Sequence, residues 1–369
     1  MNNIYLVDYL GIHCGMHYYL EAFKRVISGT PDYKVSILSN YSDDKSEKPF
    51  FINQYKGNIF KKGFALILNL NKLRRFVKKH KNNVFIYLTY GNWIDEYFMK
   101  IISKCHNHII DIHEAIAQNV DADLSLKNRF KELYSTKIKN VVSHSSRTED
   151  FLNEYGYGGF RFHVPHFKYV FPKDYDLNII DEEIKAAPEK DRINVLFFGN
   201  LSEAKGVDTL MESLNLLPYE VADKLNVIIA GKDFDGTIRR VQIKEGRSIK
   251  IFSRHISDDE LRYLYQNVDY LSLPYRKTSQ SGILEMAFYF KKPIIASDVT
   301  YFRKTLKEFP SFGVLSGNSP DEYAKTLSEI TKNHLTAVYF SDEDYARYEN
   351  RKEISQFKKE LSEWLSSHL

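Results

Sequence analysis

Residues 194–206 read NVLFFGNLSEAKG, and the predicted fold rests on the turn from strand to helix that they contain. The run Asn194–Phe198 predicts a buried strand that ends at Gly199. A polar loop follows, and Lys205-Gly206 stands where the next helix should begin. A strand that passes through a short loop into a helix is half of a βαβ unit, the building block of a parallel sheet with crossover helices.

The same alternation of short β-rich runs and longer helical patterns continues on both sides of this stretch. The predicted strands are Ile4–Val7, Lys34–Leu38, Val84–Leu88, His108–Ile112, Asn140–Ser143, Arg161–Val164, Asn194–Phe198, Asn226–Ala230, Ile249–Phe252, Tyr270–Leu273, Pro293–Ala296 and Phe312–Val314. The predicted helices include His17–Ile27, Asn71–His80, Arg147–Tyr155, Val207–Asn215, Asp258–Gln266, Gly282–Tyr289 and Asp321–Lys332. The pattern predicts an α/β protein with two Rossmann-like, doubly wound domains that face a cleft at the carboxyl ends of their strands.

The length of 369 residues also suggests two domains. We expect an N-terminal domain over residues 1–170 and a C-terminal domain over 190–341. The charged segment Phe171–Arg192, interrupted by Pro172 and Pro188, predicts a linker between them. In the tail 342–369, apolar residues recur on one helical stripe; they are Phe357, Leu361, Trp364 and Leu365.

Composition excludes several classes of protein. Lys and Arg total 52 and Asp and Glu 48, a net charge of +4, which argues against an acidic tail and against a dedicated nucleic-acid binder. The only cysteines, Cys14 and Cys105, form neither a redox motif nor a zinc knuckle, and they fit a reducing cytosol. We find no apolar run long enough to span a membrane and no signal-peptide pattern, and we expect a cytoplasmic protein.

Three segments of the second half resemble a phosphate site. Lys205 at a helix N-terminus adds a positive charge to exposed N–H groups. Gly231 ends the strand that follows, where a ligand can approach the backbone. In LPYRKTSQSGILEMA, residues 273–287, Ser279, Gln280 and Ser281 precede an apolar helix that begins at Gly282. Their donors predict an anion cradle that needs no metal. A capped helix without a ligand is the alternative.

These segments, the helix start at Ser257-Asp258-Asp259-Glu260-Leu261 and KPIIASD at residues 292–298 together resemble glycosyltransferase family 4. Members of this family have the GT-B type of fold, and the Ser-Gln-Ser-Gly turn is similar to that of the bacterial polysaccharide-biosynthesis branch. The resemblance is specific over residues 193–300. It implies that the C-terminal domain binds a nucleotide-sugar donor, that the N-terminal domain binds the acceptor, and that the helix 342–369 packs back on the N-terminal domain.

The resemblance also assigns roles to single residues. Lys205 contacts the donor diphosphate, and Ser281-Gly282 wraps it. His113 hydrogen-bonds a sugar hydroxyl, and Glu114 orients the sugar or acts as a base, so the catalytic group is His113, Glu114 and Lys205. The donor-binding set also includes Gly11, Gly15, Gly199, Asn200, Gly231, Arg254, Lys277, Ser279, Gln280, Ile283 and Glu285.

Three of these positions depart from the family pattern or leave alternatives open. Asn200 stands where many members have an arginine, and Glu285 is one position out of the usual register. Lys277 either faces a donor sugar that carries a carboxylate, such as a uronic acid, or is a solvated lysine. The loop Asp8–Tyr18 resembles the family's glycine-bearing loop and lacks the GxGxxG pattern of dinucleotide-binding enzymes.

Residues 48–94 contain no Asp or Glu and many cations. The basic residues are Lys48, Lys56, Lys61, Lys62, Lys72, Arg74, Arg75, Lys78, Lys79 and Lys81. Together with apolar residues such as Phe64 and Leu68, they favour an anionic membrane surface. A solvated helix face is the alternative, and no nucleic-acid module accompanies the charge.

The expected protein is a cytoplasmic glycosyltransferase, peripheral on the inner face of the cell membrane. It would move a sugar from a nucleotide-sugar to a lipid-linked or oligosaccharide acceptor in the synthesis of a bacterial surface polysaccharide such as capsule or O-antigen. We expect retention of anomeric configuration, no metal and no further cofactor. A GT-B type nucleotide-sugar epimerase and a catalytically silent sugar-binding scaffold stay open as alternatives.

Overall fold

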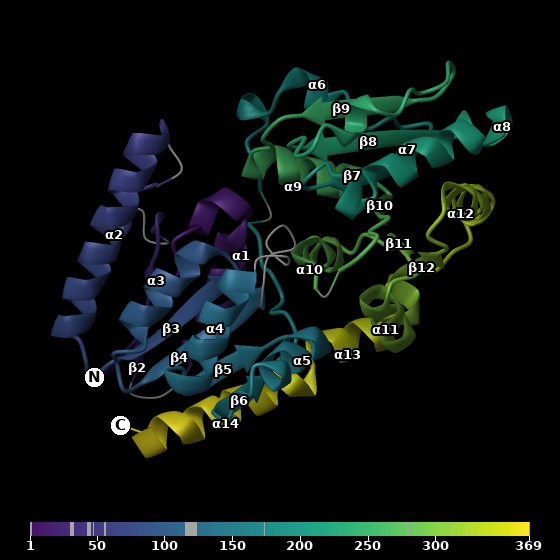
Figure 1. Ribbon diagram of the computed structural model, residues 1–369. Helices are drawn as coiled ribbons and strands as arrows, with labels where there is room; N and C mark the ends of the chain where they lie inside the picture. The colour runs from purple at the N-terminus through teal and green to yellow at the C-terminus, as the bar shows by residue number, and fades with distance from the viewer. Residues whose placement is uncertain are drawn as a thin grey trace. The chain divides into compact units, whose positions relative to one another are not determined.

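The computed structural model describes residues 2–29, 33–42, 46, 48–54, 57–114, 124–172, 174–278 and 280–368. The chain divides into two compact units, unit 1 with residues 1–169 and 351–369 and unit 2 with residues 170–350. Each unit contains one six-stranded parallel sheet. The predicted fold class, α/β with two doubly wound domains, is confirmed (Figure 1).

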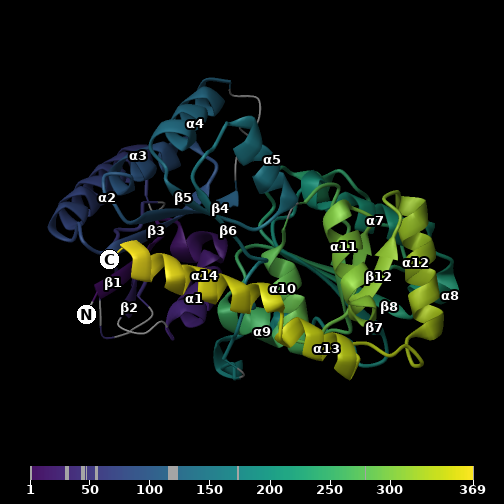
Figure 2. The ribbon, with the colours of Figure 1, turned by 90° about the horizontal axis from the view of Figure 1, so that it is seen from below.

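In unit 1 the sheet order is β2-β1-β3-β4-β5-β6. Its strands are β1 (Asn2–Val7), β2 (Tyr33–Leu38), β3 (Val84–Tyr90), β4 (His108–Glu114), β5 (Asn140–Ser143) and β6 (Phe160–His163). Its helices are α1 (Met16–Ile27), α2 (Ile59–Lys79), α3 (Trp93–Ile102), α4 (Leu124–Thr136), α5 (Ser146–Glu154) and α14 (Lys352–His368), with a 3₁₀ turn η1 (Gly11–Cys14). Figure 2 shows α2, α3 and α4 on one side of the sheet and α1 and α14 on the other. Because helices cover both faces, every residue of β3 is buried.

In unit 2 the order β9-β8-β7-β10-β11-β12 reverses direction between β7 and β10. The strands are β7 (Ile193–Phe198), β8 (Leu225–Gly231), β9 (Ile249–Ser253), β10 (Tyr270–Leu273), β11 (Ile294–Ser297) and β12 (Gly313–Ser316). The helices are α6 (Glu182–Lys185), α7 (Val207–Leu216), α8 (Tyr219–Ala222), α9 (Asp258–Asn267), α10 (Gly282–Tyr289), α11 (Thr300–Glu308), α12 (Pro320–Asn333) and α13 (Asp342–Glu349), with 3₁₀ turns η3 (Leu177–Ile179), η4 (Glu203–Lys205), η5 (Thr237–Arg239) and η6 (Pro310–Phe312). A core of Val, Leu, Ile and aromatic side chains fills the space between β7, β8, α7 and α12.

Helix α2 is longer than the sequence pattern predicted. It begins at Ile59, where the side chain of Asn58 accepts a hydrogen bond of 3.0 Å from the amide of Lys61. The expected helix began at Asn71, because the first half of α2 carries exposed Phe60 and Phe64 that obscure its amphipathic period. Lys56 of the basic stretch lies outside the described residues.

Residues 171–192 are part of unit 2 and do not form a free linker. Ile180 and Ile184 are buried, and α6 packs against α9. The side chain of Asp181 caps α6 by accepting from the amide of Glu183 at 2.9 Å. The high charge of this segment belongs to its outer face, which is why composition alone suggested a linker.

The C-terminal tail forms two helices that belong to different units, and not one helix over 342–369. Helix α13 lies in unit 2, where Tyr348 is buried against Phe288, Phe309 and Phe312. Helix α14 lies in unit 1, beside α1 and β6. Its four stripe residues, Phe357, Leu361, Trp364 and Leu365, are buried. The chain therefore returns to unit 1 at Arg351, nine residues later than the expected start of the packed-back segment at 342.

Candidate functional site

The loops that follow β7 and β10 in unit 2 lie at the point where the strand order reverses. Open α/β sheets bind ligands outside the carboxyl ends of their strands at this switch point. The loop after β7 carries Gly199, Asn200 and Lys205, and the loop after β10 leads to Ser281 and α10. Two of the three segments predicted to bind phosphate therefore flank the switch point.

Glycines allow these loops to pack backbone against backbone. A Cβ atom on Gly206 would collide with the carbonyl oxygen of Pro274, and one on Gly231 would collide with that of Gly199. Both glycines have positive φ, 68° and 146°. The amide of Arg276 donates to the carbonyl of Ala204 at 3.2 Å, which ties the two loops together. The edge of the sheet is thus a fixed surface of backbone groups.

Lys205 is the half-buried cation of this surface. Its Nζ lies 4.0 Å from the centroid of the buried Tyr275 ring, a cation–π contact that orients the ammonium group. The neighbouring Arg276 is paired with Asp208 at 2.5 Å and with Glu203 at 3.2 Å. No carboxylate of the described residues forms an ion pair with Lys205. Its charge is therefore available to an anion.

Helix α10 begins beside this cation-bearing loop. Ser281 caps it by accepting a hydrogen bond of 3.3 Å from the amide of Leu284. The side chain of Ile283 lies next to Gly199, and Gly282 is the first helical residue. The partial positive charge of the helix N-terminus adds to that of Lys205.

The remaining polar residues of this loop are placed differently. Gln280 is half-buried, and its backbone carbonyl oxygen accepts a hydrogen bond from Thr278 Oγ1 at 2.6 Å. Lys277 and Asn200 are exposed. Ser279 lies outside the described residues.

Two predicted donor-binding residues have their charged groups engaged inside unit 2. The carboxylate of Glu285 is on the buried side of α10, 2% exposed, and accepts a hydrogen bond of 2.5 Å from the hydroxyl of Tyr348. The guanidinium of Arg254 forms two hydrogen bonds to Glu260, at 2.7 and 3.0 Å, and an ion pair with Asp181 at 3.3 Å. In this structure both residues hold helices α10, α13 and α9 in place.

In unit 1 the strand order reverses between β1 and β3, and the loop with Gly11 and Gly15 follows β1. Asp8, at the end of β1, fixes the start of this loop. Its carboxylate is fully buried and accepts from the amides of Leu10 at 2.9 Å and Gly11 at 2.7 Å, and from the hydroxyl of Tyr90 at 2.5 Å. Burial raises the pKa of Asp8, although these hydrogen bonds oppose the rise.

His113 lies near the end of β4, and its ring packs among other rings. The ring centroids of Tyr19 and His166 are 4.9 and 5.5 Å from that of His113. Burial lowers the pKa of His113 to about 4, so the imidazole is neutral near pH 7. A neutral imidazole can both donate and accept a hydrogen bond, which suits a sugar hydroxyl. The side chain of Glu114 lies outside the described part of the structure.

A buried polar network behind His113 was not predicted. Asp111 Oδ1 is 2.9 Å from His144 Nε2, and the hydroxyl of Tyr19 donates to Asp111 Oδ2 at 2.7 Å. His144 Nδ1 is 2.9 Å from the carbonyl oxygen of Val164. The network joins α1, β4 and the segments after β5 and β6, and it fixes Asp111 two residues from His113. An aspartate inside the apolar run IIDI, residues 109–112, is the one sequence signal that could have indicated it.

Neither unit shows a metal centre in its described part. Within those residues, no group of three or more His, Cys, Asp or Glu side chains could hold a metal ion. The described helices also contain none that is long and apolar enough to span a bilayer.

Residues 179–352 match the model of the family described as "Glycosyl transferases group 1". No curated protein sequence matches the chain. Among solved structures, sucrose-phosphate synthase from Thermosynechococcus elongatus is similar with a TM-score of 0.73 at 14% identity, over 100% of both chains. HepE from Anabaena, in complex with UDP and glucose, has a TM-score of 0.68 at 14% identity, over 100% of both chains. WaaG, a glycosyltransferase involved in lipopolysaccharide biosynthesis, has a TM-score of 0.63 at 12% identity, over 97% of this chain and 98% of its own. At such identities the likeness establishes the fold, which is that of GT-B glycosyltransferases.

Proposed function

We propose that this protein is a glycosyltransferase that uses a nucleotide-sugar donor, held by unit 2. The family match covers most of unit 2, from residue 179 to 352. HepE, which has the same fold, is solved with UDP and glucose and with UDP-glucose. The finer family placement, glycosyltransferase family 4 with a Ser-Gln-Ser-Gly turn, is part of this proposal.

One observation carries the proposal. Lys205 and the N-terminus of α10 stand on the two loops that flank the switch point of unit 2. In the proposed reaction the bond between the sugar C1 and the diphosphate oxygen breaks, and a bond from C1 to the acceptor oxygen forms. The proton of the acceptor hydroxyl passes to the departing diphosphate. The diphosphate leaves with its negative charge, which the ammonium of Lys205, Ser281 and the helix N–H groups stabilise. These donors need no metal, and we propose a metal-independent, retaining transfer.

In unit 1 we propose that His113 and Glu114 contact the transferred sugar. His113 would hydrogen-bond a hydroxyl as a neutral imidazole, because burial keeps its pKa near 4. The network around Asp111 would hold β4 in position for this contact. Gly11 and Gly15 would let the loop after β1 approach the donor phosphates.

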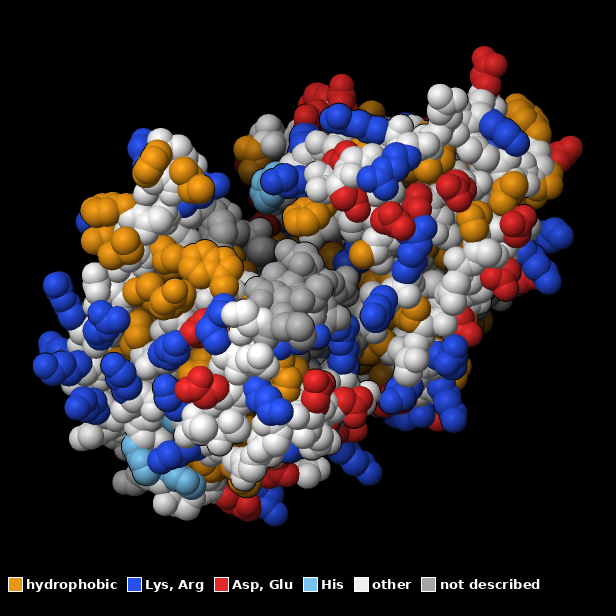
Figure 3. Space-filling model, in the orientation of Figure 1, with side chains coloured by type: hydrophobic (Ala, Val, Ile, Leu, Met, Phe, Trp, Pro, Cys, Tyr) orange, Lys and Arg blue, Asp and Glu red, His pale blue; other side chains and the backbone are white. Residues whose placement is uncertain are grey.

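We also propose that the acceptor is lipid-linked and that α2 docks on an anionic membrane. Phe60, Phe64 and Ile67 of α2 are 84%, 63% and 57% exposed, and cations follow on the same helix. Figure 3 shows hydrophobic side chains over one end of α2 and Lys and Arg over the other. This composition suits an interfacial helix. It supports a role at the cytoplasmic face of the membrane, in the synthesis of a bacterial surface polysaccharide such as capsule or O-antigen.

The proposal is tested by thermal unfolding of the purified protein with UDP-, GDP-, ADP-, TDP- and CMP-sugars in the absence of metal. One of these donors, at about 100 times its Kd, should stabilise the protein by about 2.7 kcal/mol. Lys205→Ala should abolish the shift. Lys224→Ala is the matched control, because Lys224 is an exposed lysine before the amino end of β8, at the opposite edge of the same sheet.

A sugar-binding scaffold without activity is the second candidate, favoured by the engaged side chains of Arg254 and Glu285. Turnover distinguishes the two. If the wild-type protein releases the sugar and His113→Ala binds the donor normally but releases none, the scaffold is excluded. If the wild-type protein binds a donor and never releases its sugar with any lipid-linked or oligosaccharide acceptor, the scaffold holds.

A further inference from the structure

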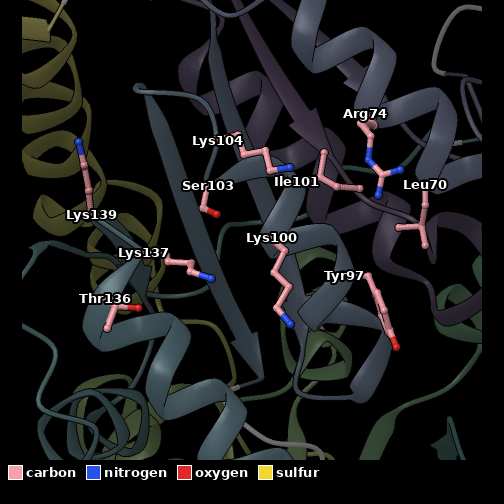
Figure 4. Close-up of a pocket in the computed structure, with 10 residues that line it drawn as sticks. All are labelled: Leu70, Arg74, Tyr97, Lys100, Ile101, Ser103, Lys104, Thr136, Lys137 and Lys139. Atoms are coloured by element: carbon pink, nitrogen blue, oxygen red, sulfur yellow. The ribbon is translucent and has the colours of Figure 1, made fainter.

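A basic pocket of about 620 Å³ opens on the surface of unit 1 between α2, α3 and the segment after α4. Its cations are Arg74, Lys100, Lys104, Lys137 and Lys139. Leu70, Tyr97 and Ile101 add apolar surface. Figure 4 shows that these side chains come from separate elements. Leu70 and Arg74 come from α2, Tyr97, Lys100 and Ile101 from α3, Lys104 from just after α3, and Lys137 and Lys139 from beyond α4.

The positive charge of this pocket is only partly neutralised. Lys100 pairs with Glu96 at 2.5 Å, and Glu96 also accepts from Arg129 at 2.7 Å. Among the residues that the structure describes, no carboxylate forms an ion pair with Arg74, Lys104, Lys137 or Lys139. Four cations around one cavity repel one another, and an anion in the cavity would offset that repulsion.

The position of the pocket separates it from the proposed reaction. Lys104 precedes β4 and Lys139 directly precedes β5, so the pocket lies at the amino edge of the sheet. Asp8 and His113 stand at or near the ends of β1 and β4, toward the carboxyl edge. A ligand in the pocket would therefore be held there and not transformed.

Helix dipoles explain only some of these cations. Lys104 and Lys137 follow the last turns of α3 and α4, where positive charge is favourable in any protein. Arg74 lies inside α2, and Lys139 precedes a strand. The dipole argument also gives no reason for an open cavity between the charges.

The pocket continues the exposed stripe of α2. Phe60, Phe64 and Ile67 occupy one face of the helix, and Asn71 and Arg74 continue it at the same three- and four-residue spacing. A helix that lies on a bilayer with Phe60 and Phe64 inserted would bring Arg74 to the level of the headgroups. The anion that a membrane offers at this level is a lipid phosphate.

We infer that this pocket binds the phosphate group of an anionic lipid headgroup. Arg74, Lys104 and Lys137 would donate to the phosphate oxygens, and Leu70 and Tyr97 would contact the apolar part next to it. The inference rests on the membrane docking proposed above and not on the identity of the donor sugar. It adds a direct contact to a lipid phosphate, whereas the charge of residues 48–94 alone would give an attraction that depends only on the net charge of the membrane.

The test compares two double variants that each remove two positive charges from unit 1. Lys104→Ala/Lys137→Ala changes the pocket, and Lys131→Ala/Lys358→Ala changes exposed lysines that do not line it. Binding is measured by flotation with vesicles of phosphatidylcholine containing one third phosphatidylglycerol. Because each basic residue at an anionic surface contributes about 1 kcal/mol, the pocket variant should bind about 25-fold more weakly. The control should lose no more than about twofold, because charges beyond a Debye length are screened.

Equal losses in the two variants would mean that charge alone attracts the membrane, and would overturn the inference. A second arm titrates inorganic phosphate and glycerol phosphate by calorimetry. Millimolar binding of these ions that the pocket variant abolishes, with vesicle binding unchanged, would assign the pocket to a free phosphate and also overturn the lipid assignment. Sugar release from the donor, assayed without vesicles, should be the same in both variants. If the wild-type protein releases no sugar, that result would count against the proposed transferase function and not against lipid binding by the pocket.

Discussion

The hydroxyl of Tyr19 is a single group that supports the buried polar network beside His113. It donates to the buried carboxylate of Asp111, which also contacts His144. Burial, followed by the charge of Asp111, raises the pKa of Tyr19 well above its usual value, so the phenol stays protonated and continues to donate. Removing this donor leaves a buried carboxylate oxygen short of a hydrogen bond.

Tyr19→Phe should therefore lower the free energy of unfolding by about 1–3 kcal/mol. Urea denaturation measures the change. Tyr219→Phe is the matched control, because Tyr219 is 63% exposed. A Tyr19→Phe protein as stable as the control variant would show that the hydrogen bond from Tyr19 to Asp111 contributes nothing to stability.

The pH dependence of stability follows from His113. Its pKa is about 4 in the folded protein and about 6.5 when unfolded. Between these values the unfolded state binds a proton that the folded state does not, so the stability falls as the pH drops from about 6.5 to about 4. Thermal unfolding over this range should show the fall. His113→Gln should make the dependence of stability on pH shallower. A part of the dependence should remain, because burial also lowers the pKa of His166. An unchanged slope in His113→Gln would contradict the assignment.

The last residue of β8, Gly231, has no room for a side chain. A Cβ on Gly231 would collide with the carbonyl of Gly199, and its φ of 146° disfavours any other residue. Gly231→Ala should destabilise the protein by about 2–4 kcal/mol, as measured by urea denaturation. Gly63→Ala, in helix α2 with nothing near the new atom, should instead stabilise it by up to about 1 kcal/mol. The same sign for both variants would mean that the two loops do not pack as described.

In helix α2 we expect binding, and not stability, to change, because the exposed Phe60 and Phe64 contribute little to the fold. Phe60→Ser/Phe64→Ser should leave the thermal midpoint unchanged and reduce binding to phosphatidylglycerol vesicles by more than tenfold, since two aromatic rings no longer enter the bilayer. Phe234→Ser is a control for lost exposed apolar surface, because Phe234 is 69% exposed in unit 2. Vesicle binding that survives the double substitution would rule out α2 as the docking helix.

For the whole molecule, unit 1 depends on a helix from the far end of the chain. Trp364 of α14 is buried against Phe162, and its indole N–H donates to Asn140 at 3.1 Å. Trp364→Ala should cost about 3–5 kcal/mol in unit 1. Trp93→Ala, at a position that is 51% exposed, should cost far less. Limited proteolysis followed by peptide mapping should find new cleavage in unit 1 only, and cleavage spread equally over both units would contradict the division.

Much of this architecture could be predicted from the sequence, because a parallel strand buried on both faces is a short apolar run. The twelve strands lie within two residues of the predicted bounds. The start of α2 and the packing of 171–192 were missed, since exposed phenylalanines in one and surface charge in the other hide the burial pattern. The partners of Asp111, Glu285 and Arg254 were also missed. They depend on tertiary contacts, Tyr19 with Asp111 and Tyr348 with Glu285, that local patterns do not contain.

The division of unit 1 between residues 1–169 and 351–369 also has a consequence for biosynthesis. A ribosome that has completed β6 must still translate all of unit 2 before α14 emerges. At the usual pace of synthesis this takes on the order of 10–40 s. In the finished protein the ring of Phe357 packs against those of Phe23 and Phe162. During that interval Phe23 and Phe162 lack this packing partner. Unit 2 can thus fold while unit 1 still lacks its last helix.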